Sequence, residues 1–106
     1  MILTSEELQQ KIDSGEKFIV DMYADWCGPC RMVGPIVEKV SNELKESGHE
    51  VNVYKFDIEK GRDMAAKLGV RSIPALKGFN GGKNVVNKVG MISEKQLMEM
   101  VNEVLV

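Results

Sequence analysis

The stretch KFIVDMYADWCGPCR, residues 17–31, decides the fold of this chain. It opens with a nearly continuous apolar run at residues 17–24 that is rich in β-branched and aromatic side chains. Such a run predicts a strand buried on both faces, as in a parallel sheet covered by helices. Both cysteines of the chain follow, at Cys27 and Cys30, and a helical pattern starts at Cys30. The pair is therefore expected at a strand-to-helix turn.

The size and charge of the chain restrict what it can be. Its 106 residues, 43% of them hydrophobic, suffice for one core, so we expect a single domain over residues 1–106. The net charge is −2 and no basic stripe occurs, which argues against nucleic acid as a ligand. The N-terminal residues lack the features of a secretory signal, and no apolar stretch approaches the roughly 20 residues of a membrane span. We therefore expect a soluble cytoplasmic protein without membrane contact.

Outward from this stretch, helical and strand patterns alternate. Capping residues and amphipathic periodicity predict helices beginning at Thr4 or Ser5, at Cys30, after Asp57 and after Ser93. Apolar runs predict strands at residues 17–24, 51–56, 75–79 and 84–89, with a very short strand at 2–3 before them. The sequence NGGK at 80–83 is a hairpin signal. The fold class is therefore α/β, with a mixed sheet of four to five strands and four flanking helices. Helical connections imply parallel pairing, and the hairpin adds an antiparallel edge.

Three structural explanations for two close cysteines are weak. A closed zinc site needs four ligands, of which a CxxC motif supplies two, and His49 is the only histidine. A structural disulfide would close so short a loop that it removes little entropy from the unfolded chain. Two incidental core cysteines would not explain Gly28 and Pro29 between them, because these are turn residues and turns lie at the surface.

A catalytic role explains more of the pattern. Unpaired N–H groups and the helix dipole favour a thiolate at Cys27, and a thiol so placed has a lowered pKa. A thiolate is the species that attacks disulfides. Pro29 costs little in the first turn of a helix, and Cys30 lies one turn on, where it can attack the sulfur of Cys27. The spacing therefore predicts a redox-active Cys27–Cys30 pair that opens disulfides, with Cys27 attacking and Cys30 resolving.

Asp21 lies inside the apolar strand run, six residues before Cys27. Its neighbours Val20 and Met22 are apolar, so we expect the carboxyl group to be buried rather than on an exposed edge. Burial raises the pKa of a carboxyl group, which suits a general acid or base. Asp21 is therefore a third candidate catalytic residue.

From about Phe18 onward the chain resembles the thioredoxin family. The resemblance rests on Asp21, WCGPC at 26–30, Pro35 inside the second helix, VRSIP at 70–74, the NGGK hairpin and KVG at 88–90. It implies a thioredoxin fold and a dithiol–disulfide oxidoreductase that takes part in electron transport and cell redox homeostasis. It also implies disulfide-containing protein substrates, a separate thioredoxin reductase as electron donor, a monomer, and no bound metal or organic cofactor.

The resemblance also assigns roles to single residues. Asp21 would assist proton movement at Cys30, with Lys55 nearby in the next strand. A cis Ile73–Pro74 bond would face the cysteines and pair with an extended substrate peptide. The contact surface would be completed by Trp26, Gly28, Pro29 and Gly90.

Two positions depart from the family pattern. Lys77 and Gly78 stand where family members usually continue an apolar strand, so this strand or a partner surface is expected to differ. Tyr23 stands where many members have Trp. An alternative role is a binding module within a larger assembly, which would tolerate serine at both cysteines. A disulfide oxidase or isomerase, or a glutaredoxin, fits Gly28-Pro29 less well by family analogy.

Overall fold

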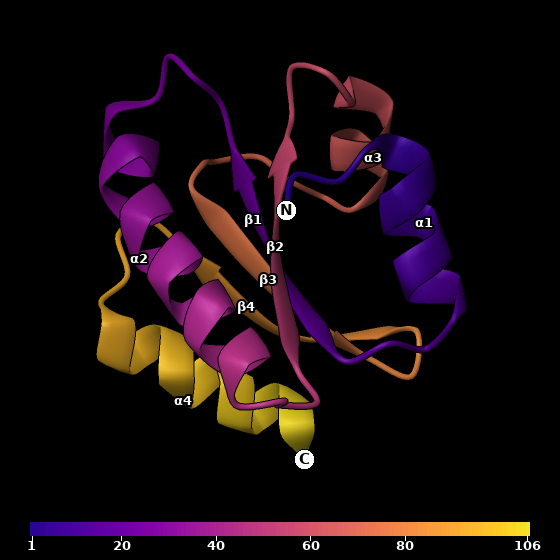
Figure 1. The fold of residues 1–106 in the computed structure, drawn as a ribbon. Coiled ribbons are helices and arrows are strands. Elements are labelled where there is room, and N and C mark those ends of the chain that lie inside the picture. The colour runs from indigo at the N-terminus through magenta and orange to yellow at the C-terminus, as the bar shows by residue number, and fades with distance from the viewer.

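The computed structural model describes residues 1–106 and contains four helices and four strands (Figure 1). In chain order they are α1 (Ser5–Asp13), β1 (Phe18–Tyr23), α2 (Gly28–Glu46), β2 (Asn52–Asp57), α3 (Arg62–Lys67), β3 (Ala75–Asn80), β4 (Lys83–Val89) and α4 (Glu94–Leu105). The strands form one sheet in the order β2-β1-β3-β4. An isolated parallel bridge from Ile2 to Lys55 extends it at the β2 edge. The expected mixed sheet with four helices is confirmed.

Strand directions follow from the lengths of the connections. β1 and β2 are parallel, as expected from the long helix α2 between them. β3, however, is antiparallel to β1, so the expectation that every helical connection gives parallel pairing is wrong for α3. A six-residue helix rises about 9 Å, whereas a six-residue strand spans about 20 Å, so α3 cannot carry the chain back along the sheet. The chain re-enters beside Met22, near the end of the sheet where β2 stops at Asp57.

The helices cover both faces of the sheet (Figure 1). α2 and α4 pack on one face over a core of 13 buried residues that includes Ile19, Val53 and Leu76. α1 and α3 lie over the other face, where Phe18, Val20 and other members of a second buried cluster gather. Side chains alternate along a strand, so Asp21 and Tyr23 share the face of Ile19 and point toward α2.

Local sequence signals set the ends of the elements. Ser93 forms the capping box with Gln96 that its sequence predicts, and Thr4, one of the two expected caps of the first helix, forms a capping box with Glu7. The β3–β4 hairpin turns at Gly81 and Gly82, whose φ angles are 63° and 83°. Both positions of such a turn need the left-handed region, which glycine enters without strain.

Gly78 explains one departure from the family pattern. A Cβ atom at this position would overlap side-chain methyl groups of Val104 in α4 and Val86 in β4. The space that an apolar side chain would fill on this face is therefore taken by two valines from neighbouring elements. Lys77 points to the opposite face, where it is half-buried and its Nζ donates a 3.1 Å hydrogen bond to Asn87. Its partial burial lowers the pKa of Lys77.

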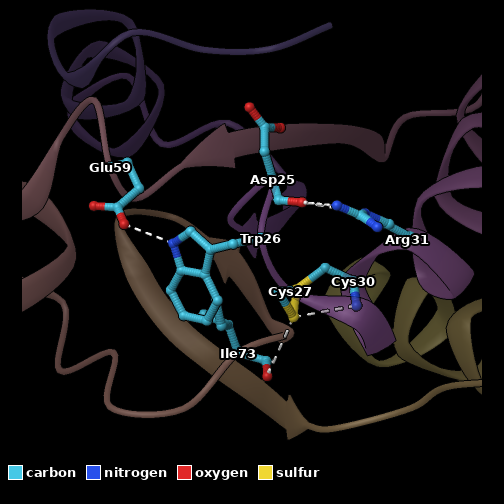
Figure 2. Close-up of a disulfide and its surroundings, with 7 residues drawn as sticks. All are labelled: Asp25, Trp26, Cys27, Cys30, Arg31, Glu59 and Ile73. Atoms are coloured by element: carbon cyan, nitrogen blue, oxygen red, sulfur yellow. Dashed lines mark hydrogen bonds between the residues drawn. A yellow bond between two sulfur atoms is a disulfide. The ribbon is translucent and has the colours of Figure 1, made fainter.

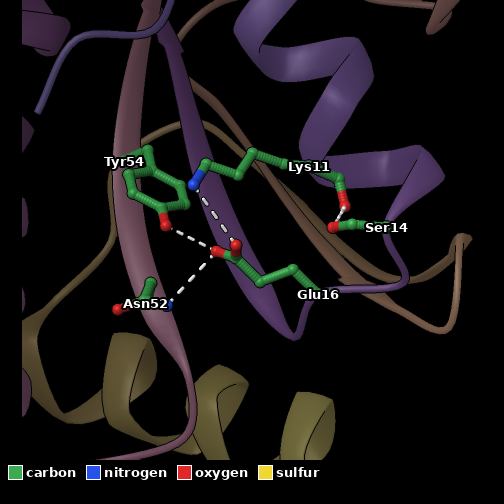
Figure 3. Close-up of polar contacts among 5 residues, drawn as sticks. All are labelled: Lys11, Ser14, Glu16, Asn52 and Tyr54. Carbon is green, nitrogen blue, oxygen red and sulfur yellow. Dashed lines mark hydrogen bonds and ion pairs between the residues drawn. The ribbon is translucent and has the colours of Figure 1, made fainter.

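The carboxylate of Glu16 joins α1 to β2 (Figure 3). Glu16 accepts hydrogen bonds from the hydroxyl of Tyr54 and the side-chain amide of Asn52, and it forms a 3.3 Å ion pair with Lys11. The ammonium group of Lys11 also lies 5.2 Å from the centre of the Tyr54 ring. Burial, with the hydrogen bond and charge of Glu16, raises the pKa of Tyr54.

Candidate active site

The cysteine pair lies at the junction of β1 and α2, as the sequence predicts. Cys27 is the N-cap of α2, and its Sγ accepts a 3.2 Å hydrogen bond from the backbone N–H of Cys30. The two residues form a disulfide across a Cα–Cα distance of 5.2 Å. Pro29 occupies the first turn of α2, where its missing N–H leaves no helical bond unmade. A thiolate on Cys27 would therefore meet an N–H group already aimed at it.

Both sulfur-bearing residues are more enclosed than a surface turn suggests. Cys27 is 5% exposed and Cys30 is 4% exposed, while Gly28 and Pro29 between them are exposed. The turn itself lies at the surface, as Gly28 and Pro29 indicate, but the side chains of both cysteines pack inward with Ala24.

An exposed tryptophan borders the disulfide (Figure 2). Trp26 is 65% exposed, and its indole Nε1 donates a 2.6 Å hydrogen bond to Glu59. Glu59 also pairs with Arg62. The hydrogen bond from Trp26, aided by the charge of Arg62, lowers the pKa of Glu59. The ring is thus held in place while its apolar faces remain open to a partner, as is typical of a binding surface.

The segment before β3 closes the other side of the site. The Ile73–Pro74 bond is cis, as the family resemblance implied. The carbonyl oxygen of Ile73 lies 3.9 Å from the Sγ of Cys27 (Figure 2). The backbone N–H of Gly90, whose φ is 94°, donates a 2.8 Å hydrogen bond to the carbonyl of Pro74. These backbone groups and Trp26 form a shallow rim around the disulfide.

Asp21 is fully buried in β1, as predicted, on the face that α2 covers. Neither of its carboxylate oxygens has a hydrogen-bond partner. Burial raises the pKa of Asp21 to about 6, and the positive charge of Lys55 limits the rise. Lys55 is its neighbour in register on β2. An unpaired carboxyl group with a pKa near neutrality is suited to exchange protons.

A hollow of about 470 Å³ opens beside Cys30 on the flank of α2. Its lining residues include Tyr23, Arg31, Pro35, Glu38 and Lys55. The guanidinium group of Arg31 donates to the carbonyl oxygen of Asp25 at 2.9 and 3.1 Å (Figure 2).

The structure brings together most of the residues singled out from the sequence. Two partners were missed: Glu59, which holds Trp26 from 33 positions away, and Glu38, whose helical periodicity assigned it to an exposed face. No local signal marks either residue. No group of three or more His, Cys, Asp or Glu side chains is arranged to hold a metal ion. No helix is both long and apolar enough to cross a membrane.

Comparisons with known proteins agree with this geometry. The family model for thioredoxin matches residues 1–103. A thioredoxin of Buchnera aphidicola is 36% identical over 102 residues, which cover 95% of this chain and 92% of that protein. A thioredoxin of Mycoplasmoides gallisepticum is 33% identical over 99 residues, which cover 93% of this chain and 95% of the other.

Solved structures give the same result. A mutant thioredoxin from Halobacterium salinarum has a TM-score of 0.83 and 30% identity, covering 96% of this chain and 87% of that one. The thioredoxin of Malassezia sympodialis has a TM-score of 0.85 and 25% identity, covering 99% and 90%. With its CxxC pair at disulfide distance, this chain therefore belongs to the thioredoxin family of thiol–disulfide oxidoreductases.

Proposed function

We propose that the chain reduces disulfide bonds in other proteins, with Cys27 as the attacking thiolate and Cys30 as the resolving thiol. The observation that carries this proposal is the position of Cys27 as the N-cap of α2, where an N–H group is aimed at its sulfur. Cys30, three residues on, lines the hollow beside α2. Residues 1–106 would act as one thioredoxin domain.

The reaction takes two exchange steps. The Cys27 thiolate attacks one sulfur of the substrate disulfide, so that a Cys27–substrate bond forms and the other substrate sulfur leaves as a thiolate. Cys30 then loses its proton and attacks the Sγ of Cys27. This forms the Cys27–Cys30 disulfide and releases the second substrate thiolate. Two electrons have then passed from the dithiol to the substrate, and a separate reductase must return them.

Asp21 serves as the proton acceptor for Cys30 in the second step, directly or across one water molecule. Its support is the burial of the carboxyl group on the face toward α2 and its pKa of about 6. A base with a pKa near the working pH accepts and returns a proton most readily. Lys55 is a supporting residue that acts through Asp21, and Pro35 shapes the wall of the hollow.

The substrate surface consists of Trp26, Gly28, Pro29, Ile73, Pro74 and Gly90. An extended peptide would pair with backbone groups near Pro74 while its apolar side chains cover the Trp26 ring. The chain would act in the cytoplasm as a monomeric electron carrier, supplied by a thioredoxin reductase. It needs no metal or organic cofactor in this scheme, because the disulfide itself carries the electrons.

The test is reduction of insulin disulfides with dithiothreitol as the electron source. Wild type should accelerate the reaction, and Cys27→Ser should abolish the acceleration. Cys30→Ser should instead accumulate a mixed disulfide with the substrate, detectable by mass spectrometry. A Cys27–Cys30 reduction potential more oxidising than the cytosolic glutathione pool would overturn the reductase assignment and indicate disulfide formation. Full function in cells with serine at both positions would indicate a binding module instead.

A further inference from the structure

Lys55 does not bond to the carboxylate it lies beside. It is paired in register with Asp21 across β1 and β2, yet both Asp21 oxygens lack a hydrogen-bond partner. The Lys55 ammonium group instead lies 3.7 Å from a carboxylate oxygen of Glu38 in α2. It also lies 4.7 Å from the centre of the Tyr23 ring. The Lys55 cation is therefore drawn toward Glu38, which lines the same hollow.

The path of the Lys55 side chain is built into the surrounding elements. Its side chain is 19% exposed, whereas that of Glu38 is 61% exposed, so the pair spans from the interior to the rim. Gly34 in α2 borders it, since a Cβ atom there would lie in ordinary contact with the Lys55 Nζ, at 3.5 Å. Tyr23 supports it from β1 by a cation–π contact. The ammonium group is therefore held by Glu38 and Tyr23.

The other charged and titratable groups around this layer come from five segments. They are Tyr23 of β1, Asp25 of the β1–α2 turn, Cys30, Arg31, Glu38 and Lys45 of α2, Lys55 and Asp57 of β2, and the amino group of Met1. β3 presents Leu76 opposite Asp21, and the buried side chains of α4 are apolar. Burial and the charges of Asp57, Asp25 and Asp21 raise the pKa of Tyr23, so the tyrosine stays neutral.

We infer that Glu38 is a positioning residue for the redox reaction: by holding the Lys55 ammonium group against its own carboxylate, it keeps Asp21 a weakly screened carboxyl group. This inference rests on the proposed role of Asp21. Two effects of Glu38 act in the same direction. Its negative charge disfavours ionisation of Asp21, and its ion pair keeps the Lys55 cation from approaching Asp21.

The consequence is a proton acceptor matched to the working pH. Without Glu38, the Lys55 cation would be free to pair with the unbonded Asp21 oxygens. The ionised form of Asp21 would gain stability, and Asp21 would become a weaker base for the Cys30 thiol. Glu38 touches neither sulfur nor substrate, so its effect would pass entirely through Lys55 and the charge of the hollow.

The experiment follows the titration of the Asp21 carboxyl carbon by ¹³C NMR in the intact oxidised protein, with the signal identified by its absence in Asp21→Asn. Glu38→Gln should lower the midpoint by about 0.5 to 1 pH unit, of which the lost charge of Glu38 accounts for roughly 0.2 to 0.3 and the approach of Lys55 to Asp21 for the rest. Lys55→Met should raise the Asp21 midpoint. In the Lys55→Met background, Glu38→Gln should lower the midpoint by less than half of the shift that it causes in wild type, because the positioned cation is gone.

Glu43→Gln is the matched control. Glu43 lies on the same helix and pairs with Lys39 at 4.0 Å, away from the hollow, so its loss should leave the midpoint unchanged. A Glu38→Gln midpoint that stays constant or rises would overturn the inference, as would an equal shift in Glu43→Gln. Equal shifts in the presence and absence of Lys55 would also overturn it. Insulin reduction by wild type, Cys27→Ser and Cys30→Ser tests the proposed function separately, because the cysteine roles do not depend on the Asp21 midpoint.

Discussion

The indole nitrogen of Trp26 donates a 2.6 Å hydrogen bond to the carboxylate of Glu59, 33 positions further along the chain. The bond links the turn before the cysteines to the connection between β2 and α3. It fixes an exposed ring whose position determines the shape of the rim around the disulfide (Figure 2).

Removing this acceptor should impair the reduction of proteins more than of small molecules. In Glu59→Ala the Trp26 ring loses its anchor, so kcat/KM for insulin should fall about twofold to fivefold through a higher KM. Reduction of a small aromatic disulfide should change little, because it needs less of the rim. Glu59→Gln keeps a hydrogen-bond acceptor and should therefore retain most of the wild-type kcat/KM for insulin. Equal losses for both substrates would show that Glu59 acts on the cysteines rather than on the contact surface.

Replacing Asp21 should stabilise the fold above neutral pH. Folding raises the pKa of Asp21 from 3.8 to about 6, so between about pH 4 and 6 the native state holds a proton that the unfolded chain has lost. Wild type therefore loses stability as the pH rises through this window, by about 2–3 kcal/mol in total. Asp21→Asn lacks this loss. In urea unfolding, the free energy of unfolding of Asp21→Asn minus that of wild type should grow from pH 4 to pH 7. A difference that does not vary with pH would contradict the assignment.

The same variant should slow the chemistry that Asp21 is proposed to assist. Asn cannot accept the proton of Cys30, so release of substrate from the mixed disulfide should slow by about tenfold or more near pH 7. Formation of the mixed disulfide by Cys27 should change less. Rapid-quench alkylation separates the two steps. Unchanged release would remove Asp21 from the catalytic scheme while leaving both cysteine roles in place.

A side chain at Gly78 should destabilise the sheet. The Cβ of Gly78→Ala would overlap the methyl groups of Val104 and Val86, so we expect a loss of about 1–3 kcal/mol in the free energy of unfolding. Val104→Ala should recover part of this loss when combined with Gly78→Ala, although alone it leaves a cavity. Chemical denaturation of the two single variants and the double variant checks this. Strictly additive losses would mean that the overlap is relieved elsewhere.

The Glu16 contacts should contribute measurably to stability (Figure 3). Glu16→Ala leaves the partly buried Tyr54 hydroxyl without its acceptor, so unfolding should become easier by about 1–2 kcal/mol. The pKa of Tyr54 should also fall back toward its ordinary value, as seen by ultraviolet titration. In a Tyr54→Phe background the same substitution should cost clearly less. An equal cost in both backgrounds would assign the stabilisation to Lys11 and Asn52 instead.

Several elements were predictable because their signals are local. A capping box needs only residues three positions apart, so Thr4 and Ser93 mark their helices in the sequence itself. The two glycines of the hairpin meet a backbone requirement that few other residues satisfy. The CxxC spacing likewise lies within one turn, although α2 begins at Gly28, with Cys27 as its N-cap, rather than at Cys30.

The direction of β3 and the burial of the cysteines were not local properties. α3 gives a helical signal like any other, but its short length, set against that of the strands, decides that the chain re-enters at the same end of the sheet. Gly28 and Pro29 indicate an exposed turn correctly, whereas the N-cap geometry directs the sulfur atoms inward. In both cases the outcome depends on elements that close in three dimensions.

The sequence by itself determined the cysteine pair, the strand that carries Asp21, the helix that follows and the family to which the chain belongs. It did so because apolar periodicity, caps and turns act over a few residues. Only the tertiary structure decided that Glu59 holds Trp26, that Val104 fills the space above Gly78, and that Lys55 turns from Asp21 to Glu38. These contacts join residues far apart in the chain, and their geometry exists only once helices and sheet have packed together.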